Sequence, residues 1–336
     1  MWFSSGNVKQ ILFMLTLTLL ISACQPNSQQ PLQRHLQTAG GAYAADISED
    51  TRFSVVSSTV RGIDLWDIEK NQIIYNWSQQ QDNSDNLVLL LDMSANNSHV
   101  MSANSKAFAL WNMKTGQSEG YWQVRESTIR DIAVANNGRY VLIGKSNGVV
   151  VHLTLATGRR LEFLGHQEKI NSVDMLPNGR VAISGGNDFV AYVWDTQSGQ
   201  VIYRFNHPTR VSKVALDSKG RFAFTADSRK NANIWDLKTG KLISKLHYTQ
   251  RQEIFSSVRF SPDGKTLLTG SPSRKVSVWD IATGKRLHEW FVPPKDKKRA
   301  SGAVVYSVAY GDKIQNQQVI YTLSSSGYLE KWLIQQ

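Results

Sequence analysis

The chain has 336 residues, of which 41% are hydrophobic and 19% charged, and ten of them are Trp. This composition excludes an intrinsically disordered protein and is sufficient for a large buried core. The formal net charge of +11 favours acidic partners or anionic surfaces over basic ones.

The sequence of residues 1–23 is that expected of a secretory signal peptide, which is not part of the folded domain. Lys9 is their only charged residue, and the run Ile11 to Ile21 is apolar apart from two Thr. This run is shorter than the roughly 20 residues that a membrane-spanning helix needs. A basic start, a short apolar run and small residues at its end are instead typical of a signal peptide. The end, Ile21-Ser22-Ala23-Cys24, resembles a bacterial lipobox, whose Cys is lipidated after cleavage before it.

Cys24 is the only cysteine of the chain, which fits a thiol used for lipid attachment. It leaves no possibility of a disulfide within one monomer. The alternative is an ordinary signal peptide with a Cys by chance. Stable anchoring needs at least two acyl chains, and the triacylated Cys that the lipobox implies supplies them. Gln25 follows instead of Asp, which would resemble an inner-membrane retention signal. We therefore expect an outer-membrane lipoprotein facing the periplasm, in which residues 24–31 are the lipidated Cys and a linker.

From residue 32 onward the sequence repeats. In each repeat one strand-length segment ends with Trp or, in one case, Leu: Trp66, Trp111, Leu153, Trp194, Trp235, Trp279 and Trp332. Successive residues of this set are 45, 42, 41, 41, 44 and 53 positions apart. Five residues after six of them stands a residue that tolerates positive φ: Asn71, Gly116, Gly158, Gly199, Gly240 and Gly284. The sequence therefore predicts seven copies of one structural unit.

The stretch Gly165 to Asp195 shows this unit most completely. It contains three segments rich in Val and Ile that are separated by turn residues, as expected for short strands. With its Gly-His start and Trp-Asp end, it resembles the WD40 repeat, in which about 40–45 residues form one four-stranded propeller blade. The resemblance implies an all-β, seven-bladed propeller over residues 32–336. It also implies a structural hydrogen-bonding tetrad in which the serine bridges to the indole: His166, Ser184, Asp188 and Trp194.

The last repeat is incomplete, because only four residues follow Trp332. Residues 32–36 stand ahead of the first inner strand, predicted at 42–47, as residues 160–164 stand ahead of Ile170. We therefore predict that residues 32–36 supply the missing fourth strand of the last blade. Such closure removes an open sheet edge. The tetrad is complete only in the fourth repeat, since Arg229 and Ser273 stand where the fifth and sixth would carry Asp.

His166, Ser184 and Asp188 have the composition of a hydrolase triad, but the resemblance assigns them to structure. The chain has no nucleophile elbow, P-loop or dinucleotide fingerprint. No His stands at metal-binding spacing from another His or a Cys. Propeller enzymes usually carry several acidic residues at the central mouth, and the sequence shows no such cluster. We therefore expect no catalytic residue, metal or cofactor. Three Trp fall on fourth strands, where they pack at the rim or offer a stacking surface for carbohydrate: Trp77, Trp122 and Trp290.

In the implied fold, the loop before each inner strand and the hairpin between the second and third strands share one face. This face is predicted to be basic and to hold the candidate partner-binding residues: Arg229, Lys230, Arg251, Arg274, Lys295, Lys297, Lys298 and Arg299. The loop 291–302 is the longest within the repeats, and such loops are often functional. The alternative is a solvated surface that charge keeps soluble.

These observations lead us to expect a membrane-anchored envelope lipoprotein that acts as a non-catalytic scaffold. Its partner would be an acidic protein, and the propeller itself would be a monomer. One alternative is recognition of an anionic envelope polymer or lipid headgroup, and a less favoured one is a propeller hydrolase. Nucleic acid binding fits the sequence pI of about 9.6 but does not fit an exported lipoprotein. Analogy with other proteins of the same fold is weak evidence for any of these functions.

Overall fold

The computed structural model describes residues 29–79, 87–249, 253–295 and 302–334. The chain divides into two units, Met1–Gln30 and Pro31–Gln336. The predicted signal peptide, Cys24 and most of the linker lie outside the described residues, so those expectations stay predictions. Within the described ranges, no helix has the length and hydropathy needed to cross a bilayer.

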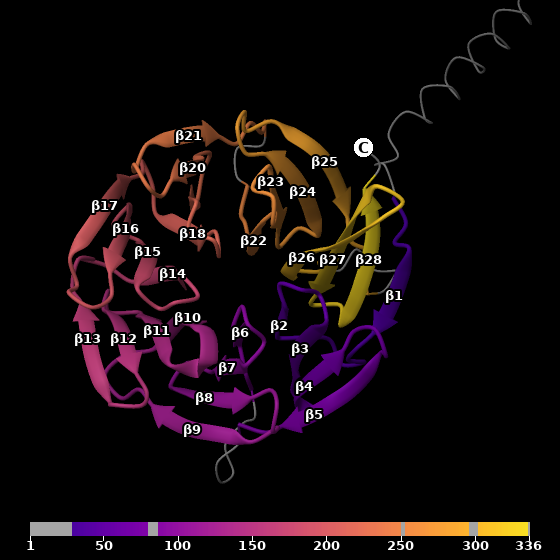
Figure 1. Cartoon of the computed structure of the whole chain (residues 1–336), viewed down its shortest axis with the longest axis horizontal. Coiled ribbons are helices and arrows are strands. Elements are labelled where there is room, and N and C mark those ends of the chain that lie inside the picture. Colours follow the sequence, from indigo (N-terminus) through magenta and orange to yellow (C-terminus); the bar gives the residue numbers. More distant parts are fainter. Residues whose placement is uncertain (1–28, 80–86, 250–252, 296–301, 335–336) are drawn as a thin grey trace, which may run out of the picture. The chain divides into compact units, whose positions relative to one another are not determined.

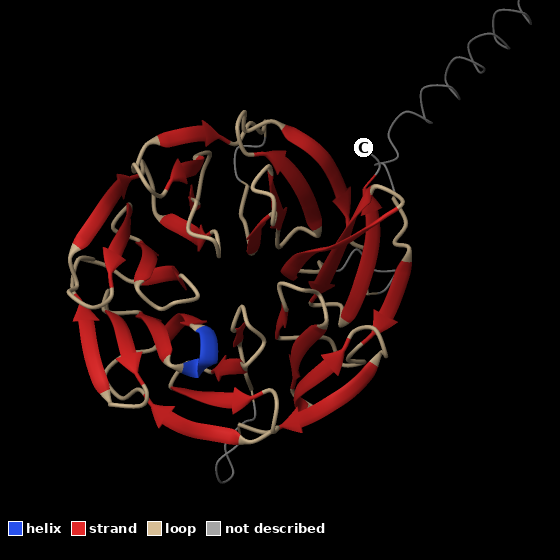
Figure 2. Ribbon diagram, in the orientation of Figure 1, coloured by secondary structure: helices blue, strands red, loops and turns tan. Residues whose placement is uncertain are grey.

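Residues 31–336 form, within the described ranges, seven four-stranded antiparallel sheets arranged as blades around a central axis (Figures 1 and 2). The first four blades each use four consecutive strands. Blade 1 has β2 (Ala44–Ile47), β3 (Phe53–Ser58), β4 (Gly62–Asp67) and β5 (Gln72–Trp77). Blade 2 has β6 (Leu90–Met93), β7 (His99–Ala103), β8 (Ala107–Asn112) and β9 (Ser118–Gln123). Blade 3 has β10 (Ile129–Val134), β11 (Tyr140–Lys145), β12 (Val150–Thr154) and β13 (Arg159–Phe163). Blade 4 has β14 (Ile170–Met175), β15 (Val181–Gly186), β16 (Val190–Asp195) and β17 (Val201–Asn206).

The remaining blades follow the same pattern until the last. Blade 5 has β18 (Val211–Leu216), β19 (Phe222–Asp227), β20 (Ala232–Asp236) and β21 (Leu242–Lys245). Blade 6 has β22 (Ser257–Phe260), β23 (Thr266–Gly270), β24 (Lys275–Asp280) and β25 (Arg286–Phe291). Blade 7 has β26 (Val305–Ile314), β27 (Gln317–Ser324), β28 (Tyr328–Ile334) and β1 (Gln33–Leu36). Among the described residues, helical structure is confined to one 3₁₀ turn, Asn136–Gly138 (Figure 2). The predicted all-β propeller of seven blades is therefore confirmed.

The closure of the last blade is also confirmed. β1 pairs antiparallel with β28, from Gln33 opposite Lys331 to Leu36 opposite Tyr328. The strand order of blade 7 is β1-β28-β27-β26, so the start and the end of the propeller share one sheet (Figure 1). The outer edge of β28 is thereby covered, which removes one exposed ladder of backbone groups.

The seven repeat positions all fall in third strands, and most of the Trp side chains pack between blades. An aromatic ring on the fourth strand of one blade stacks near the third-strand Trp of the next. The ring centroids lie 5.3 Å apart for Trp77 and Trp111, and 4.6 Å apart for Phe163 and Trp194. Trp290 is buried and lies 5.8 Å from Trp332. Inter-blade packing therefore explains Trp77 and Trp290, and offset aromatic pairs add about 0.5–1.5 kcal/mol each beyond their buried area.

The turns between third and fourth strands need a left-handed backbone. Asn71 has φ 49° and Gly284 has φ 69°. A Cβ at Gly284 would lie 1.9 Å from the carbonyl oxygen of Lys245 in the preceding blade. Only glycine fits this close approach.

Two faces of the propeller follow from the strand directions. The loops before the inner strands and the hairpins between second and third strands form what we call the loop face. The turns between first and second strands, and between third and fourth strands, form the turn face. The inner strands line the central channel, and β1 runs from the turn face to the loop face.

Candidate functional site

The predicted tetrad of blade 4 forms in part. The imidazole Nε2 of His166 lies 2.9 Å from Ser184 Oγ, and its Nδ1 lies 2.9 Å from Asp188 Oδ2. Burial opposes ionisation of Asp188, but the hydrogen bond and charge of His166 bring its pKa below the usual value. The His166 side chain is completely buried. This network therefore lies inside the blade, where it satisfies buried polar groups, and a substrate does not reach it.

The expectation that Trp194 donates a hydrogen bond to Ser184 is wrong. Its indole Nε1 is buried and has no hydrogen-bond partner among the described residues. The indole ring lies almost parallel to Phe163, with 6° between the planes. Ser184 Oγ contacts His166 instead. In four other blades the indole does donate to the hydroxyl, at 2.8–2.9 Å: Trp111 to Ser102, Trp235 to Thr225, Trp279 to Thr269, and Trp332 to Thr322.

In blade 5 the acidic residue is Asp227, whereas the sequence register placed Arg229 there. His207 Nε2 lies 2.9 Å from Thr225 Oγ1, and its Nδ1 lies 3.7 Å from Asp227 Oδ2. The Asp227 carboxylate also accepts hydrogen bonds from the backbone N–H groups of residues 229–231. It ends the second strand and holds the hairpin that follows. In blade 4 the acidic residue lies six residues before the Trp, and counting back six residues from Trp235 leads to Arg229. In blade 5 the acidic residue lies two residues earlier, at Asp227, so the count missed it.

Two blades use other residues in place of His. In blade 2, Ser102 Oγ donates to Gln79 Oε1 at 2.6 Å. In blade 7, Thr322 Oγ1 donates to Glu330 at 3.3 Å, and Arg34 Nε from β1 donates to the same carboxylate at 3.0 Å. No sequence signal pointed to Gln79. An acidic residue two positions before the third-strand Trp332 could have pointed to Glu330.

The candidate partner-binding residues that the structure describes all belong to the loop face. Arg229 and Lys230 are exposed in the hairpin between β19 and β20. Arg274 is half-buried in the hairpin between β23 and β24, and its Nη1 donates to the carbonyl oxygen of Val292 at 3.4 Å. Lys295 is exposed after β25. Four candidates lie outside the described residues: Arg251, Lys297, Lys298 and Arg299.

Exposed apolar side chains that the sequence reasoning missed also lie on this face. Fifteen large hydrophobic side chains of the described ranges are exposed. Eight of them belong to loops, hairpins or strand ends of the loop face: Leu36, Tyr43, Val60, Leu89, Leu164, Phe189, Ile254 and Phe291.

Phe189 is the most unusual of these residues. It has φ 68° in the hairpin between β15 and β16, a conformation that costs a non-glycine residue about 1–2 kcal/mol. At the same place, five residues before the end position of the third strand, blades 3 and 7 carry Gly148 and Gly327 with φ 84° and 83°. Its ring is nevertheless 49% exposed. Neither the backbone nor the core requires a phenylalanine here.

Two segments, residues 158–195 and 240–280, match the family model of the WD domain, G-beta repeat (WD40). The chain contains WD40 repeats. Each match runs from the turn before an outer strand to the third strand of the next blade, and the two end in blades 4 and 6. No curated protein matches the chain. WD40 propellers are typically non-catalytic scaffolds that bind protein partners.

The central channel of the propeller is more acidic than the sequence indicated. Four carboxylates from successive inner strands line a hollow of about 270 Å³. Each carboxylate accepts a hydrogen bond from a backbone N–H of the next inner strand. The acceptors and donors are Asp46 and Met93 (3.0 Å), Asp92 and Val134 (2.6 Å), Asp131 and Val173 (2.9 Å), and Asp174 and Leu216 (2.7 Å). The reading that no acidic cluster lies at the centre is therefore wrong.

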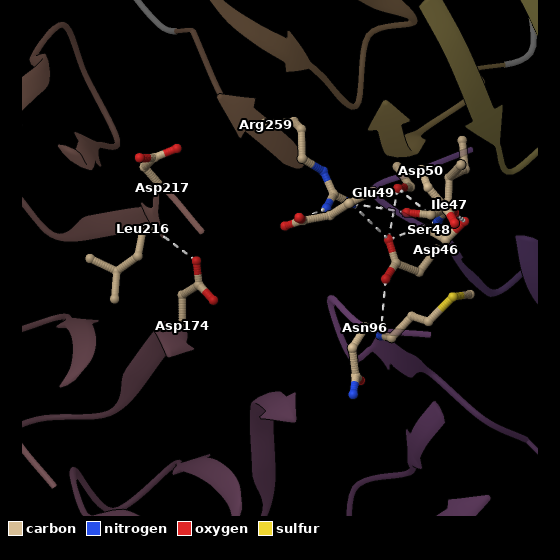
Figure 3. A network of polar contacts seen from close by, with 12 residues as sticks. Asp46, Ile47, Ser48, Glu49, Asp50, Asn96, Asp174, Leu216, Asp217 and Arg259 are labelled. Carbon is tan, nitrogen blue, oxygen red and sulfur yellow. Dashed lines mark hydrogen bonds and ion pairs between the residues drawn. The ribbon is translucent and has the colours of Figure 1, made fainter. Parts of the chain in front are cut away.

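Charge in the channel is only partly compensated. Figure 3 shows Arg259 beside Asp46 and Glu49, with Nη2 3.5 Å from Asp46 Oδ1 and Nη1 3.6 Å from Glu49 Oε1. Burial raises the pKa of Asp174 to about 6. Burial together with the charge of Asp46 raises the pKa of Asp92 well above its usual value. Among the described residues, no three His, Cys, Asp or Glu side chains are grouped closely enough to hold a metal ion. The carboxylates link blade to blade across the first five blades.

Proposed function

We propose that this WD40 propeller is a lipid-anchored protein of the bacterial cell envelope, in the outer membrane and facing the periplasm. It acts as a non-catalytic scaffold, and its loop face docks an acidic protein partner. The observation that carries this proposal is the gathering of exposed apolar and basic side chains on one face. Protein interfaces combine apolar and aromatic contacts with Arg, whereas isolated exposed apolar residues carry no such meaning.

The basic character of the loop face is stronger than a count of residues suggests. Three carboxylates on this face are engaged inside the fold. Asp188 binds His166, Asp227 holds its own hairpin, and Glu253 is buried against Lys275 at 3.0 Å. These acids offer little negative charge to a partner, while the exposed Arg and Lys of the hairpins remain accessible. An acidic partner is therefore favoured both by steering and by contact.

The proposed anchor fits a loop face that is open to a partner. β1 begins at the turn face, and eight residues, 25–32, separate it from Cys24. A fully extended chain covers at most about 3.6 Å per residue, so the nine steps from Cys24 to Gln33 span no more than about 32 Å. A lipid on Cys24 would hold the turn face nearer the membrane and direct the loop face away from it.

Crosslinking and affinity capture from intact envelopes test the scaffold. Arg229→Glu with Lys230→Glu should reduce capture of the partner more than tenfold, and added salt should weaken capture by the wild type. The matched control is Lys238→Glu with Lys241→Glu, which makes the same charge change on the turn face of the same blade. Equal losses in both variants would contradict docking on the loop face. Capture of an anionic polymer or lipid in place of a protein would favour the alternative.

The anchor is tested separately with Cys24→Ser. The variant should remain uncleaved by the lipoprotein peptidase and take up no labelled fatty acid. A variant that is processed and partitions into membranes like the wild type would refute the lipoprotein proposal and leave the scaffold proposal standing.

A further inference from the structure

A hollow of about 350 Å³ lies on the loop face between blades 4 and 5. Phe189 forms part of its wall. The other lining residues come from both blades and the loops before them: Glu168, Asn187, Thr209, Arg210, Ser228 and Arg229. The wall is held by backbone hydrogen bonds. Phe189 O accepts from the N–H of His207 at 2.8 Å, and Arg210 O accepts from the N–H of Ser228 at 3.0 Å. These bonds fix the backbone positions of Phe189 and Arg210 in the wall.

The net charge of the residues that line the hollow is positive. Arg210 and Arg229 are both exposed, and neither guanidinium forms an ion pair with any residue that the structure describes. Glu168 is the one acidic residue among the lining residues. Asp227, the nearest acid in sequence to Arg229, has its carboxylate engaged by the N–H groups of the hairpin. Two guanidinium groups at the edge of one hollow are suited to bind carboxylates, because their fork of N–H donors matches the carboxylate geometry.

We infer that this hollow binds an acidic peptide segment that places an apolar side chain on Phe189 and carboxylates on Arg210 and Arg229. The inference rests on the proposed scaffold function and names the place of contact. It explains why the strained hairpin position of blade 4 carries an exposed phenylalanine. A residue that breaks a local rule without helping the fold marks a functional position.

A peptide fits the hollow better than a uniformly charged polymer. Such a polymer would bring negative charge against Glu168 as well as against the two Arg residues. A peptide can place a neutral or basic residue next to Glu168 and an apolar one on the ring of Phe189. Asn187, Thr209 and Ser228 provide polar groups that a peptide backbone can meet.

The test measures binding of defined probes to the full-length protein by fluorescence anisotropy. The first probe is a pool of labelled nine-residue peptides in which Asp or Glu alternates with Phe, Leu or Trp. The second is the same pool with Lys in place of the acids, and the third is alginate, an anionic polysaccharide. The acidic pool should bind at least tenfold more tightly than the other two probes. Equal or tighter binding of the Lys pool or of alginate would overturn the inference.

Three variants locate the binding. Phe189→Gly and Arg210→Glu should each weaken binding of the acidic pool at least tenfold, while Lys238→Glu on the turn face should leave it unchanged. Phe189→Gly should melt no lower than the wild type, because glycine relaxes the left-handed backbone. Its loss of binding is then not a loss of folding. Unchanged binding by Phe189→Gly would refute the inference.

The outcome also separates this inference from the proposed function. If Arg229→Glu with Lys230→Glu abolishes envelope capture while Phe189→Gly and Arg210→Glu leave both capture and binding of the acidic pool unchanged, the partner docks on the loop face without this hollow and the inference fails alone. If the acidic pool binds at the hollow but no envelope protein is captured through the loop face, the scaffold proposal fails while the binding site remains.

Discussion

The closing strand β1 contributes Arg34 to an ion pair with the buried carboxylate of Glu330, 3.0 Å away. Glu330 on β28 is completely buried, and Arg34 on β1 lies across the strand pair from it. The Arg34 guanidinium also lies 3.6 Å from the centre of the Tyr328 ring. Burial raises the pKa of the Glu330 carboxyl to about 7, although Arg34 acts to lower it. Replacing Arg34 by Ala removes that opposing charge and leaves the carboxyl buried.

The size of the effect depends on pH. A pKa unit corresponds to about 1.4 kcal/mol. A shift from 4.5 to about 7 means that folding of the wild type at pH 8 carries a penalty of about 3 kcal/mol relative to the protonated carboxyl. Without Arg34 the pKa of Glu330 should rise by about one to three units more. The additional penalty is about 1–1.5 kcal/mol at pH 8 and close to zero at pH 5, where the carboxyl is protonated in both proteins.

A smaller loss does not depend on pH. Removing the guanidinium from the face of Tyr328 costs about 0.5–1 kcal/mol. Arg34→Ala should therefore lower the free energy of unfolding by about 2 kcal/mol at pH 8 and by less than about 1 kcal/mol at pH 5. Glu330→Gln should show the opposite trend, because it removes the titrating group. Its stability relative to the wild type should improve as the pH rises.

Urea unfolding followed by Trp fluorescence at pH 5, 6.5 and 8 measures these differences. Comparing each variant with the wild type at the same pH cancels the titration of all other groups. The direction of the pH dependence follows from the raised pKa of Glu330. Its contribution to the stability is complete below the pKa of the unfolded state and is lost as the pH rises through about 7. An Arg34→Ala penalty that is equal at pH 5 and pH 8 would refute this account of the closure.

Three further predictions follow from the same structure. Deleting residues 32–36 should expose the edge of β28 and cause aggregation or a large loss of stability, and a deletion variant that stays monomeric with an unchanged melting temperature would contradict the closure. Ser184→Ala should lower the free energy of unfolding by about 1–3 kcal/mol, because the buried imidazole of His166 loses its partner, as measured by urea unfolding. The raised pKa of Asp174, at about 6, means that its contribution to stability is lost as the pH rises from 4 to 7. Asp174→Asn should flatten the dependence of the melting temperature on pH in that range, and a dependence as steep as that of the wild type would contradict this assignment.

The sequence predicted those parts of the fold that each repeat encodes locally. The Trp positions and the turn glycines occupy the same place in each blade, so counting them placed the third strands and the corners correctly. Residues 32–36 were predicted as the last strand because the incomplete seventh repeat left one place empty. The predicted hydrogen bond from Trp194 to Ser184 does not form: Ser184 Oγ contacts His166, and the indole Nε1 has no partner among the described residues. Sequence register does not report such a contact.

The acidic channel was missed although a signal existed. Asp46, Asp92 and Asp174 stand at one place in the repeat, 19 or 20 residues before the end position of the third strand. That place is next to the last residue of each inner strand, facing the axis. Counting by third-strand Trp alone drew no attention to it. Because each carboxylate bonds to the following blade, its role is visible only once the blades are arranged in a ring.

The loop face differs from the rest of the propeller in how its residues relate to the fold. Inside the blades, several polar side chains have partners that stabilise the structure, such as Ser184 with His166. In the hairpins of the loop face, Phe189 and Arg274 adopt left-handed backbone where glycine would be less strained. Consistency across local rules specifies a fold, and departures from it are expected where function imposes a requirement. Substitutions in these hairpins should therefore change binding more than stability, while substitutions in the tetrads should do the reverse.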